Sequence, residues 1–141
     1  MKRYRAGHMI RPEHLNHHHN LYAGQAIEWM VEASFMAAEL TDGVKDGILF
    51  RNCHKFEFNK PVLPGEIISY EAIIVRAGTS SITVHVDMIS EDTGEIKAQG
   101  ITTFVTTEPG TTSRRAHNIV LDRTEDVQEL EYRREAEELF R

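Results

Sequence analysis

The residues best suited to chemistry lie within and just before one apolar segment. Three consecutive histidines, His17 to His19, follow Asn16, and two carboxylates, Glu28 and Glu32, lie in the segment that comes next. An imidazole is a common general base near neutral pH, and a carboxylate becomes a stronger base when burial raises its pKa. An asparagine amide both donates and accepts hydrogen bonds but cannot act as a base, so it suits orientation of a ligand or of water. This set indicates acid–base chemistry.

Several of these residues also have structural interpretations. Asn16 is common in turns, and the histidine run could be a polar loop without a special role. A metal site with His14 would need ligands at consecutive positions to converge, and no Cys or acid joins them at zinc-like spacing, so we predict no metal. Cys53 has no base at a recognisable spacing and is expected to be a small buried residue.

The two glutamates, Glu28 and Glu32, also have a structural interpretation. Buried acids are usually paired with a base, and Arg51 and Lys60 are available partners for Glu28 and Glu32. If instead the apolar segment desolvates these carboxylates, their pKa rises and either one could serve as a base.

The segment that carries both glutamates is predicted to be a helix over about 24–40. Its apolar residues cover nearly the whole circumference, and such a helix must be buried. Asn20 is a candidate cap at its start, and the turn residues from Thr41 to Gly43 end it. A helix start presents free N–H groups and the positive end of the helix dipole, so it can bind a developing negative charge.

Strand-like runs follow at about 48–59, 66–77, 80–90 and 95–107, and residues 4–9 could add one more strand. Short connectors between consecutive long strands favour antiparallel pairing. We therefore predict an α+β fold in which a curved antiparallel sheet wraps the helix. One layer cannot cover the helix on every side, so we expect a second protomer, as a homodimer or a tetramer or hexamer built from dimers.

Size and charge exclude several classes of protein. A chain of 141 residues with a net charge of −6 allows one domain, and its acidity argues against nucleic acid as a partner. A single cysteine excludes a disulfide framework and favours a cytoplasmic setting. No apolar run is long enough to cross a membrane, and none follows the basic first residues as in a signal peptide, so no membrane association is expected.

Residues 121–141 differ in composition from the body of the chain. They hold eight acidic and four basic residues, a net charge of −4. We expect a domain over 1–120 and a charged helical tail over 121–141. The tail is predicted to be a solvated surface helix, capped by Thr124 and with a sparse apolar stripe of Val127, Leu130 and Leu139.

Four motifs, in this order and spacing, resemble one known family. They are Asn16 to Gly24 followed after six residues by Val31-Glu32-Ala33, then Phe58 to Val62 with Gly65, then Arg76 to Ser81, and finally Thr103 to Val105. Together they resemble the hotdog-fold acyl-CoA thioesterases, in particular the acyl-CoA hydrolase branch, over about residues 3–119. The resemblance implies a hotdog fold, with a long central helix inside the curved sheet.

The resemblance also implies hydrolysis of an acyl-CoA thioester to free acid and CoA. It places the thioester oxygen on the backbone N–H of Ala23, with Gly24 beside it and Asn16 holding the water or the thioester. Val31 occupies the position of the family's catalytic carboxylate, so Glu28, Glu32 or a histidine would have to act as the base. An acyl-CoA lyase or hydratase, or a non-catalytic acyl-CoA-binding protein, stays open as an alternative.

The substrate's coenzyme A end is implied at the turn of Arg76, Gly78, Ser80 and Ser81. Arg76 can pair with phosphate, Gly78 allows close approach of the backbone, and the two serines can donate hydrogen bonds. Thr79 replaces an arginine of the family pattern, which implies a weaker grip on the nucleotide. Coenzyme A enters only as part of the substrate, so no separate cofactor is expected.

Overall fold

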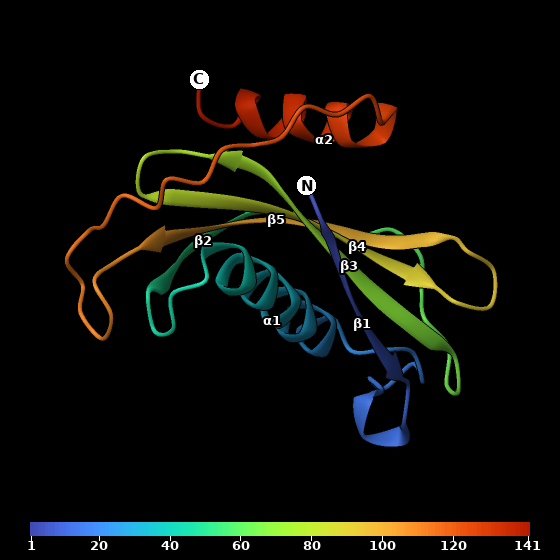
Figure 1. Ribbon diagram of the computed structural model, residues 1–141. Coiled ribbons are helices and arrows are strands. Elements are labelled where there is room, and N and C mark those ends of the chain that lie inside the picture. The colour runs from blue at the N-terminus through green and yellow to red at the C-terminus, as the bar shows by residue number, and fades with distance from the viewer.

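A five-stranded antiparallel sheet curves around one long helix, and a second helix lies on its outer face (Figure 1). The computed structural model describes all 141 residues. The elements in chain order are β1 (Arg3–Met9), a short 3-10 helix (Pro12–His14), α1 (Ala23–Asp42), β2 (Ile48–Phe58), β3 (Ile67–Ala77), β4 (Ser81–Ser90), β5 (Ile96–Thr106) and α2 (Val127–Glu138). The strand order is β1-β3-β4-β5-β2. The predicted α+β hotdog fold is therefore confirmed, with strand bounds within a residue or two of those expected.

Alternation along β4 explains how the sheet separates two layers. Ile82, Val84, Val86 and Met88 are buried in the core cluster that also contains the inner side of α1. Thr83, His85 and Asp87 alternate with them and so lie on the opposite face. This opposite, convex face is the one that α2 covers (Figure 1).

The helix α1 lies close against the concave face because the sheet offers it a glycine. Ala26, Met30, Ala33 and Ala37 form its buried side. A Cβ added at Gly100 of β5 would lie 2.9 Å from the sulfur of Met30, so a larger residue there would have to displace the end of the Met30 side chain. Small residues on both surfaces thus set the distance between helix and sheet.

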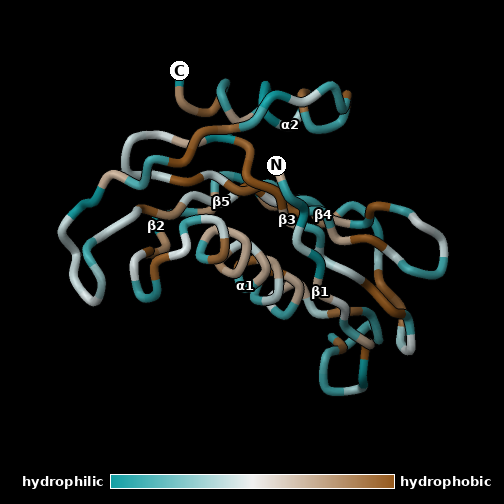
Figure 2. Tube along the Cα trace, viewed as in Figure 1, coloured by the Kyte–Doolittle hydropathy of each residue, from teal (hydrophilic) through white to brown (hydrophobic).

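One chain does not bury α1 on every side, as expected for a helix covered by a single layer of sheet. The side facing away from the sheet leaves Ile27, Phe35, Met36 and Leu40 exposed, Leu40 by 64%. Figure 2 shows the mixed hydropathy of this helix on the open side of the sheet. The sheet curves enough to cover one side of α1 only, and an apolar surface remains available to a second copy.

The capping of α1 also differs from the prediction at its start. The N-cap residue is Tyr22, not Asn20, and no side chain accepts a hydrogen bond from the first turn. The end of the helix is as expected. Gly43 adopts a left-handed conformation with φ of 75°, and its N–H donates to the carbonyl oxygen of Glu39. Neither helix is long and apolar enough to cross a membrane.

The tail prediction is wrong in two respects. The N-cap of α2 is Asp126, whose side chain accepts from the N–H of Glu129, and not Thr124. The helix is docked rather than solvated, through Tyr132 and Ala136, which pack on Ile73 and Val75 of β3. The expected stripe of Val127, Leu130 and Leu139 faces solvent, with Val127 exposed by 81%.

A buried polar cluster holds α2 on the convex face. The Asp87 carboxylate accepts hydrogen bonds from Tyr132 Oη at 2.7 Å, from Gln99 Nε2 at 2.8 Å and from His85 Nε2 at 2.9 Å. The rings of His85 and Tyr132 stack with centroids 3.5 Å apart. Burial opposes ionisation of Asp87, but these three donors outweigh it and lower the pKa of Asp87 below its usual value of 3.8.

We predict that Asp87→Asn lowers the free energy of unfolding by about 2 kcal/mol at neutral pH, because the new amide turns a donor toward one of the three donors. The folded-state pKa of Asp87 is depressed, so its contribution is present above the ordinary pKa of 3.8 and is lost as pH falls through the folded-state value. Urea titrations across pH therefore give a difference between wild type and variant that shrinks only below about pH 4.

Asp92→Asn in the exposed β4–β5 turn is the matched control and leaves stability unchanged. A difference that vanishes already near neutral pH would contradict the stabilising role of the Asp87 carboxylate.

Candidate active site

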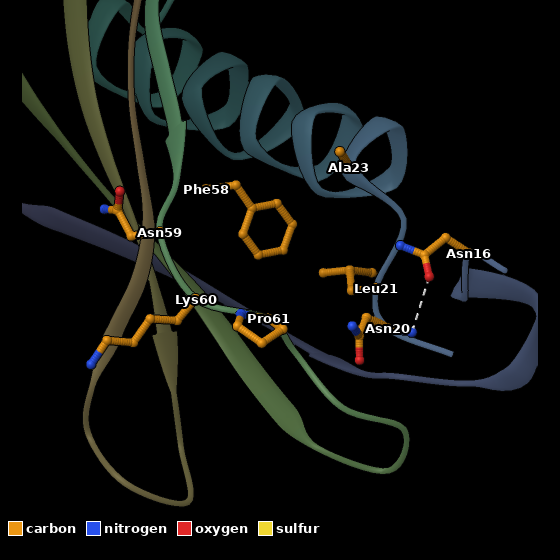
Figure 3. A pocket seen from close by; sticks show the side chains of 8 residues that line it. All are labelled: Asn16, Asn20, Leu21, Ala23, Phe58, Asn59, Lys60 and Pro61. Atoms are coloured by element: carbon orange, nitrogen blue, oxygen red, sulfur yellow. Dashed lines mark hydrogen bonds between the residues drawn. The ribbon is translucent and has the colours of Figure 1, made fainter. Parts of the chain in front are cut away.

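A cleft of about 280 Å³ opens at the start of α1, between the helix and the end of β2. Figure 3 shows its lining, which comes from the loop before α1, from the first turn of the helix and from the segment that follows β2. The residues are Asn16, Asn20, Leu21, Ala23, Phe58, Asn59, Lys60 and Pro61. Two backbone hydrogen bonds fix the entry into the helix, from Leu21 N to Val62 O and from Tyr22 N to His14 O, both 2.8 Å.

The first two amides of α1 are free to bind a ligand. In the first turn, the N–H groups of Gln25 and Ala26 both donate to Tyr22 O. The N–H groups of Ala23 and Gly24 have no acceptor. These two donors lie at the positive end of the helix dipole. A Cβ at Gly24 would meet the Tyr22 ring at 2.3 Å, so the glycine makes room for that ring beside the helix start.

Asn16 is fixed by its oxygen and leaves its nitrogen available. Its Oδ1 accepts from the N–H of His18 at 2.9 Å and from the N–H of Asn20 at 3.2 Å. Its Nδ2 has no partner in the chain and turns toward the helix start in Figure 3. The side chain therefore offers a donor to a ligand in the cleft and has no remaining capacity to orient a water as an acceptor.

The histidine run lies outside the cleft. His17 and His18 are exposed and contact each other, with ring centroids 4.0 Å apart. His14 is buried edge-on against Trp29, and its Nδ1 accepts from Arg11 N. Nowhere in the chain do three His, Cys, Asp or Glu side chains gather closely enough to hold a metal ion.

His19 has an unusual backbone conformation. Its φ is +61°, in the left-handed region that favours glycine. Glycine would adopt this φ without strain, so the loop holds His19 in a conformation that is unfavourable for a residue with a side chain.

Neither predicted base lines the cleft. Glu28 and Glu32 are exposed on α1, and Glu28 accepts only a 3.3 Å hydrogen bond from Gln25. The expected desolvation of these carboxylates is thus absent from the single chain, as is their pairing with Arg51 or Lys60. Lys60 instead pairs with Glu95 at 2.5 Å.

Val31 is partly buried and packs against the core, as does Phe56 of β2. The cleft therefore contains hydrogen-bond donors and apolar surface, but no carboxylate and no imidazole. It can hold a carbonyl oxygen, whereas a group that deprotonates water must come from elsewhere.

The residues predicted to bind coenzyme A lie at the other end of the sheet. The turn from Gly78 to Ser81 follows β3, whereas the cleft adjoins the start of that strand (Figure 1). The 11 residues of β3 separate the two ends by about 33 Å. One chain therefore does not bring the two groups of predicted site residues together.

At that turn, Arg76 faces α2. Its guanidinium lies 3.9 Å from the centroid of the Phe140 ring, and its Nε is 3.3 Å from a carboxylate oxygen of Glu137. A Cβ at Gly78 would meet Ser81 Oγ at 2.4 Å, so the close approach of the serine requires glycine. A second open cleft, of about 430 Å³, lies between Gly78, Thr79 and residues 116–120.

Sequence reasoning missed three of the polar residues that line the first cleft. The sequence analysis names Asn20 only as a helix cap, Lys60 only as an available partner for the two glutamates, and Asn59 only as part of a motif. The available signal was the position of Asn59 and Lys60 directly after a predicted strand, where loops commonly contribute to binding sites.

Comparison with known proteins places this architecture in a family. Residues 18–97, more than half of the chain, match the sequence model of the thioesterase superfamily. The chain belongs to the thioesterase superfamily. No curated protein sequence matches this superfamily member.

Several solved structures share its fold. An acyl-CoA hydrolase from Staphylococcus aureus, in complex with butyryl coenzyme A, coenzyme A and coenzyme A disulfide, matches with a TM-score of 0.85 and 22% identity, over 98% of this chain and 81% of that chain. An acyl-CoA hydrolase from Bacillus cereus matches with a TM-score of 0.82 and 24% identity, over 95% and 81%. An apo hexameric acyl-CoA thioesterase matches with a TM-score of 0.82 and 18% identity, over 98% and 88%.

We predict that His19→Gly raises the free energy of unfolding by up to about 1 kcal/mol, since glycine relieves the left-handed strain. Thermal or urea unfolding measures this directly. His18→Gly, at a position without positive φ, is the control and gives no gain. Because the imidazole of His19 is outside the cleft, any turnover of the protein stays within twofold of wild type. A tenfold loss would instead identify His19 as the base.

Proposed function

We propose that this member of the thioesterase superfamily hydrolyses an acyl-CoA thioester to a free acid and CoA. The observation that carries the proposal is a set of three unpaired donors at the start of α1: the N–H groups of Ala23 and Gly24 and the Nδ2 of Asn16, of which Ala23 and Asn16 line the cleft. Family membership and the coenzyme A complexes of the Staphylococcus aureus relative support this choice of substrate.

The donors act on the carbonyl oxygen of the thioester. A water oxygen bonds to the carbonyl carbon, and the carbonyl oxygen becomes an oxyanion. The two amides and Asn16 Nδ2 stabilise this charge, with about 3 kcal/mol for each well-placed donor. The C–S bond then breaks, the base that took one proton from the attacking water passes it to the leaving sulfur, and the carboxylic acid that forms releases its remaining proton to solvent. The positive end of α1 favours the anionic intermediate over the neutral thioester.

The proton acceptor in this proposal is Glu28 or Glu32. Both carboxylates lie on the exposed side of α1, beside the exposed apolar residues Ile27 and Phe35. A second copy that covers this side would remove water from the carboxylates, and a desolvated carboxylate is a stronger base. We therefore propose a homodimer as the active unit. The apo hexameric relative supports assembly of such dimers into larger oligomers.

The same assembly would supply the coenzyme A end of the site. We propose that the turn containing Arg76, Gly78, Ser80 and Ser81 contacts the nucleotide end of a substrate whose thioester lies at the α1 start of the partner. The separation of about 33 Å along β3 favours such sharing between two chains. No cofactor beyond the coenzyme A of the substrate is required.

Release of free thiol from a panel of acyl-CoA substrates tests the proposed hydrolysis. We expect turnover by the wild type and a loss of about a hundredfold in kcat for Asn16→Ala, since one oxyanion donor is removed. Cys53 is exposed and not buried as the sequence analysis predicts, so it reacts once with a thiol reagent, and a reaction without substrate provides the baseline.

Asn16→Asp distinguishes the role of Asn16 as a donor in the cleft from its role in closing the loop. The aspartate keeps the oxygen that accepts from His18 and Asn20, but it replaces the Nδ2 donor with a negative charge. We expect an unchanged melting temperature with the same or a greater loss of turnover. Wild-type turnover in Asn16→Asp would exclude the donor role of Asn16.

Val31 favours a second candidate, a protein that binds acyl-CoA without hydrolysing it. We predict that Val31→Asp changes turnover less than tenfold, because another carboxylate acts as the base. An inactive wild type that gains a hundredfold or more with Val31→Asp, the contribution typical of a general base, would support the binding protein. Accumulation of an unsaturated acyl-CoA without free thiol would indicate a lyase or hydratase.

A further inference from the structure

A basic segment crosses the β3–β4 turn. Residues 111–121, which follow β5, contain two arginines and one histidine and no carboxylate. The segment is bonded to the turn through its backbone, from His117 N to Thr79 O at 3.2 Å. From this segment, Arg114 Nη1 donates to Ser80 Oγ at 3.2 Å. A guanidinium distant in the sequence is thereby held beside the turn.

Two other arginines near this turn, Arg115 and Arg76, are already engaged. Arg115 forms a two-pronged ion pair with Asp42, at 2.6 and 3.2 Å, and the Asp42 side chain is fully buried. Arg76 is held by Glu137 and by the face of Phe140. Both guanidiniums therefore serve to attach segments of the chain to one another.

His117 does not provide a positive charge here either. Its Nδ1 accepts from the N–H of Ile119 at 2.8 Å, and its Nε2 bonds Ser81 O at 2.9 Å. A ring nitrogen that accepts carries no proton, and the one that meets a carbonyl must donate, so the imidazole is neutral in this arrangement.

Arg114 is different, because no carboxylate lies within 4.0 Å of it. It is exposed, and its contact with Ser80 uses one of its five N–H donors. Ser80 accepts from Arg114 and keeps its own hydroxyl hydrogen to donate. A guanidinium with free donors beside a free hydroxyl matches the oxygens of a phosphate group, which guanidinium can bind with two parallel hydrogen bonds.

We propose that Arg114 binds a phosphate group of coenzyme A at this turn, together with Ser80. The inference rests on the proposed acyl-CoA substrate and changes the assignment of the cation from Arg76 to Arg114. Thr79, directly before Ser80, occupies the place of an arginine in the pattern that the chain resembles. Arg114 restores the missing charge from a different part of the sequence.

Calorimetric titration with coenzyme A tests the proposal directly. We expect Arg114→Ala to weaken coenzyme A binding roughly tenfold, as for the loss of one charged hydrogen bond. Arg134→Ala on the outer surface of α2 removes the same charge and leaves binding unchanged. Arg76→Ala has a smaller effect than Arg114→Ala. The reverse order of these two arginine variants, or an unchanged affinity in Arg114→Ala, overturns the proposal.

Ligand variants identify the phosphate. If Arg114 contacts the 3′-phosphate, Arg114→Ala binds dephospho-coenzyme A as well as wild type does. If it contacts the pyrophosphate, the tenfold loss persists with dephospho-coenzyme A. In kinetics, kcat/KM falls tenfold for an acyl-CoA and is unchanged for the same acyl-pantetheine, which has no phosphate. An equal fall for both substrates contradicts phosphate binding by Arg114.

A second variant gives a gain of function. Thr79→Arg in the Arg114→Ala background returns a guanidinium to the turn, and we expect it to recover most of the lost affinity. A wild type that binds coenzyme A without hydrolysing acyl-CoA would contradict the proposed hydrolysis alone, and the titrations would still decide the role of Arg114. A wild type that does not bind coenzyme A overturns both proposals.

Discussion

The structure depends on keeping two backbone amides uncapped at the start of a helix. A helix start without a side-chain acceptor loses about 1 kcal/mol of stability relative to a capped one. Here the cost falls at Ala23 and Gly24, beside a cleft, where the unpaired N–H groups are available to a ligand. Tertiary contacts replace the missing cap, since Leu21 and Tyr22 are anchored through their own backbone N–H groups.

The remainder of the fold holds that helix start in position. Gly100 and the small residues of α1 bring the helix down onto the concave face, so that its axis is set by the sheet. The loop before the helix is closed by the Asn16 oxygen, which leaves the nitrogen of the same side chain for the cleft. On the other face, the Asp87 cluster attaches α2 and shields the polar side of β4 from water.

Local sequence signals predicted the elements well and their surroundings poorly. The apolar run of α1 and the alternation in β4 identify those elements, because both patterns arise within a single segment. The docking of α2 was missed because it depends on a hydrogen bond between Tyr132 and Asp87, 45 residues apart. The positive φ of His19 is not evident from a histidine, because the loop and not the residue type imposes it.

The candidate site was predictable only in part, for a related reason. Asn16 and Ala23 adjoin the cleft as expected, since the helix start fixes them. The setting of Glu28 and Glu32 depends on what covers α1, which no pattern within the chain specifies. Arg76 lies at the turn that the motif predicts, and Glu137 and Phe140 from the far end of the chain contact it. A local motif does not show which distant segments contact its residues.

The length of β3 determines how a defect in one subunit would affect the active sites of an assembly. Because the proposed oxyanion donors and the proposed phosphate-binding turn lie at opposite ends of one strand, each chain in the proposed pair would belong to two reaction centres and complete neither. A subunit with a defective start of α1 could still contribute its β3–β4 turn to the active site of an intact partner subunit. Mixed pairs with complementary defects would then retain one working centre in two.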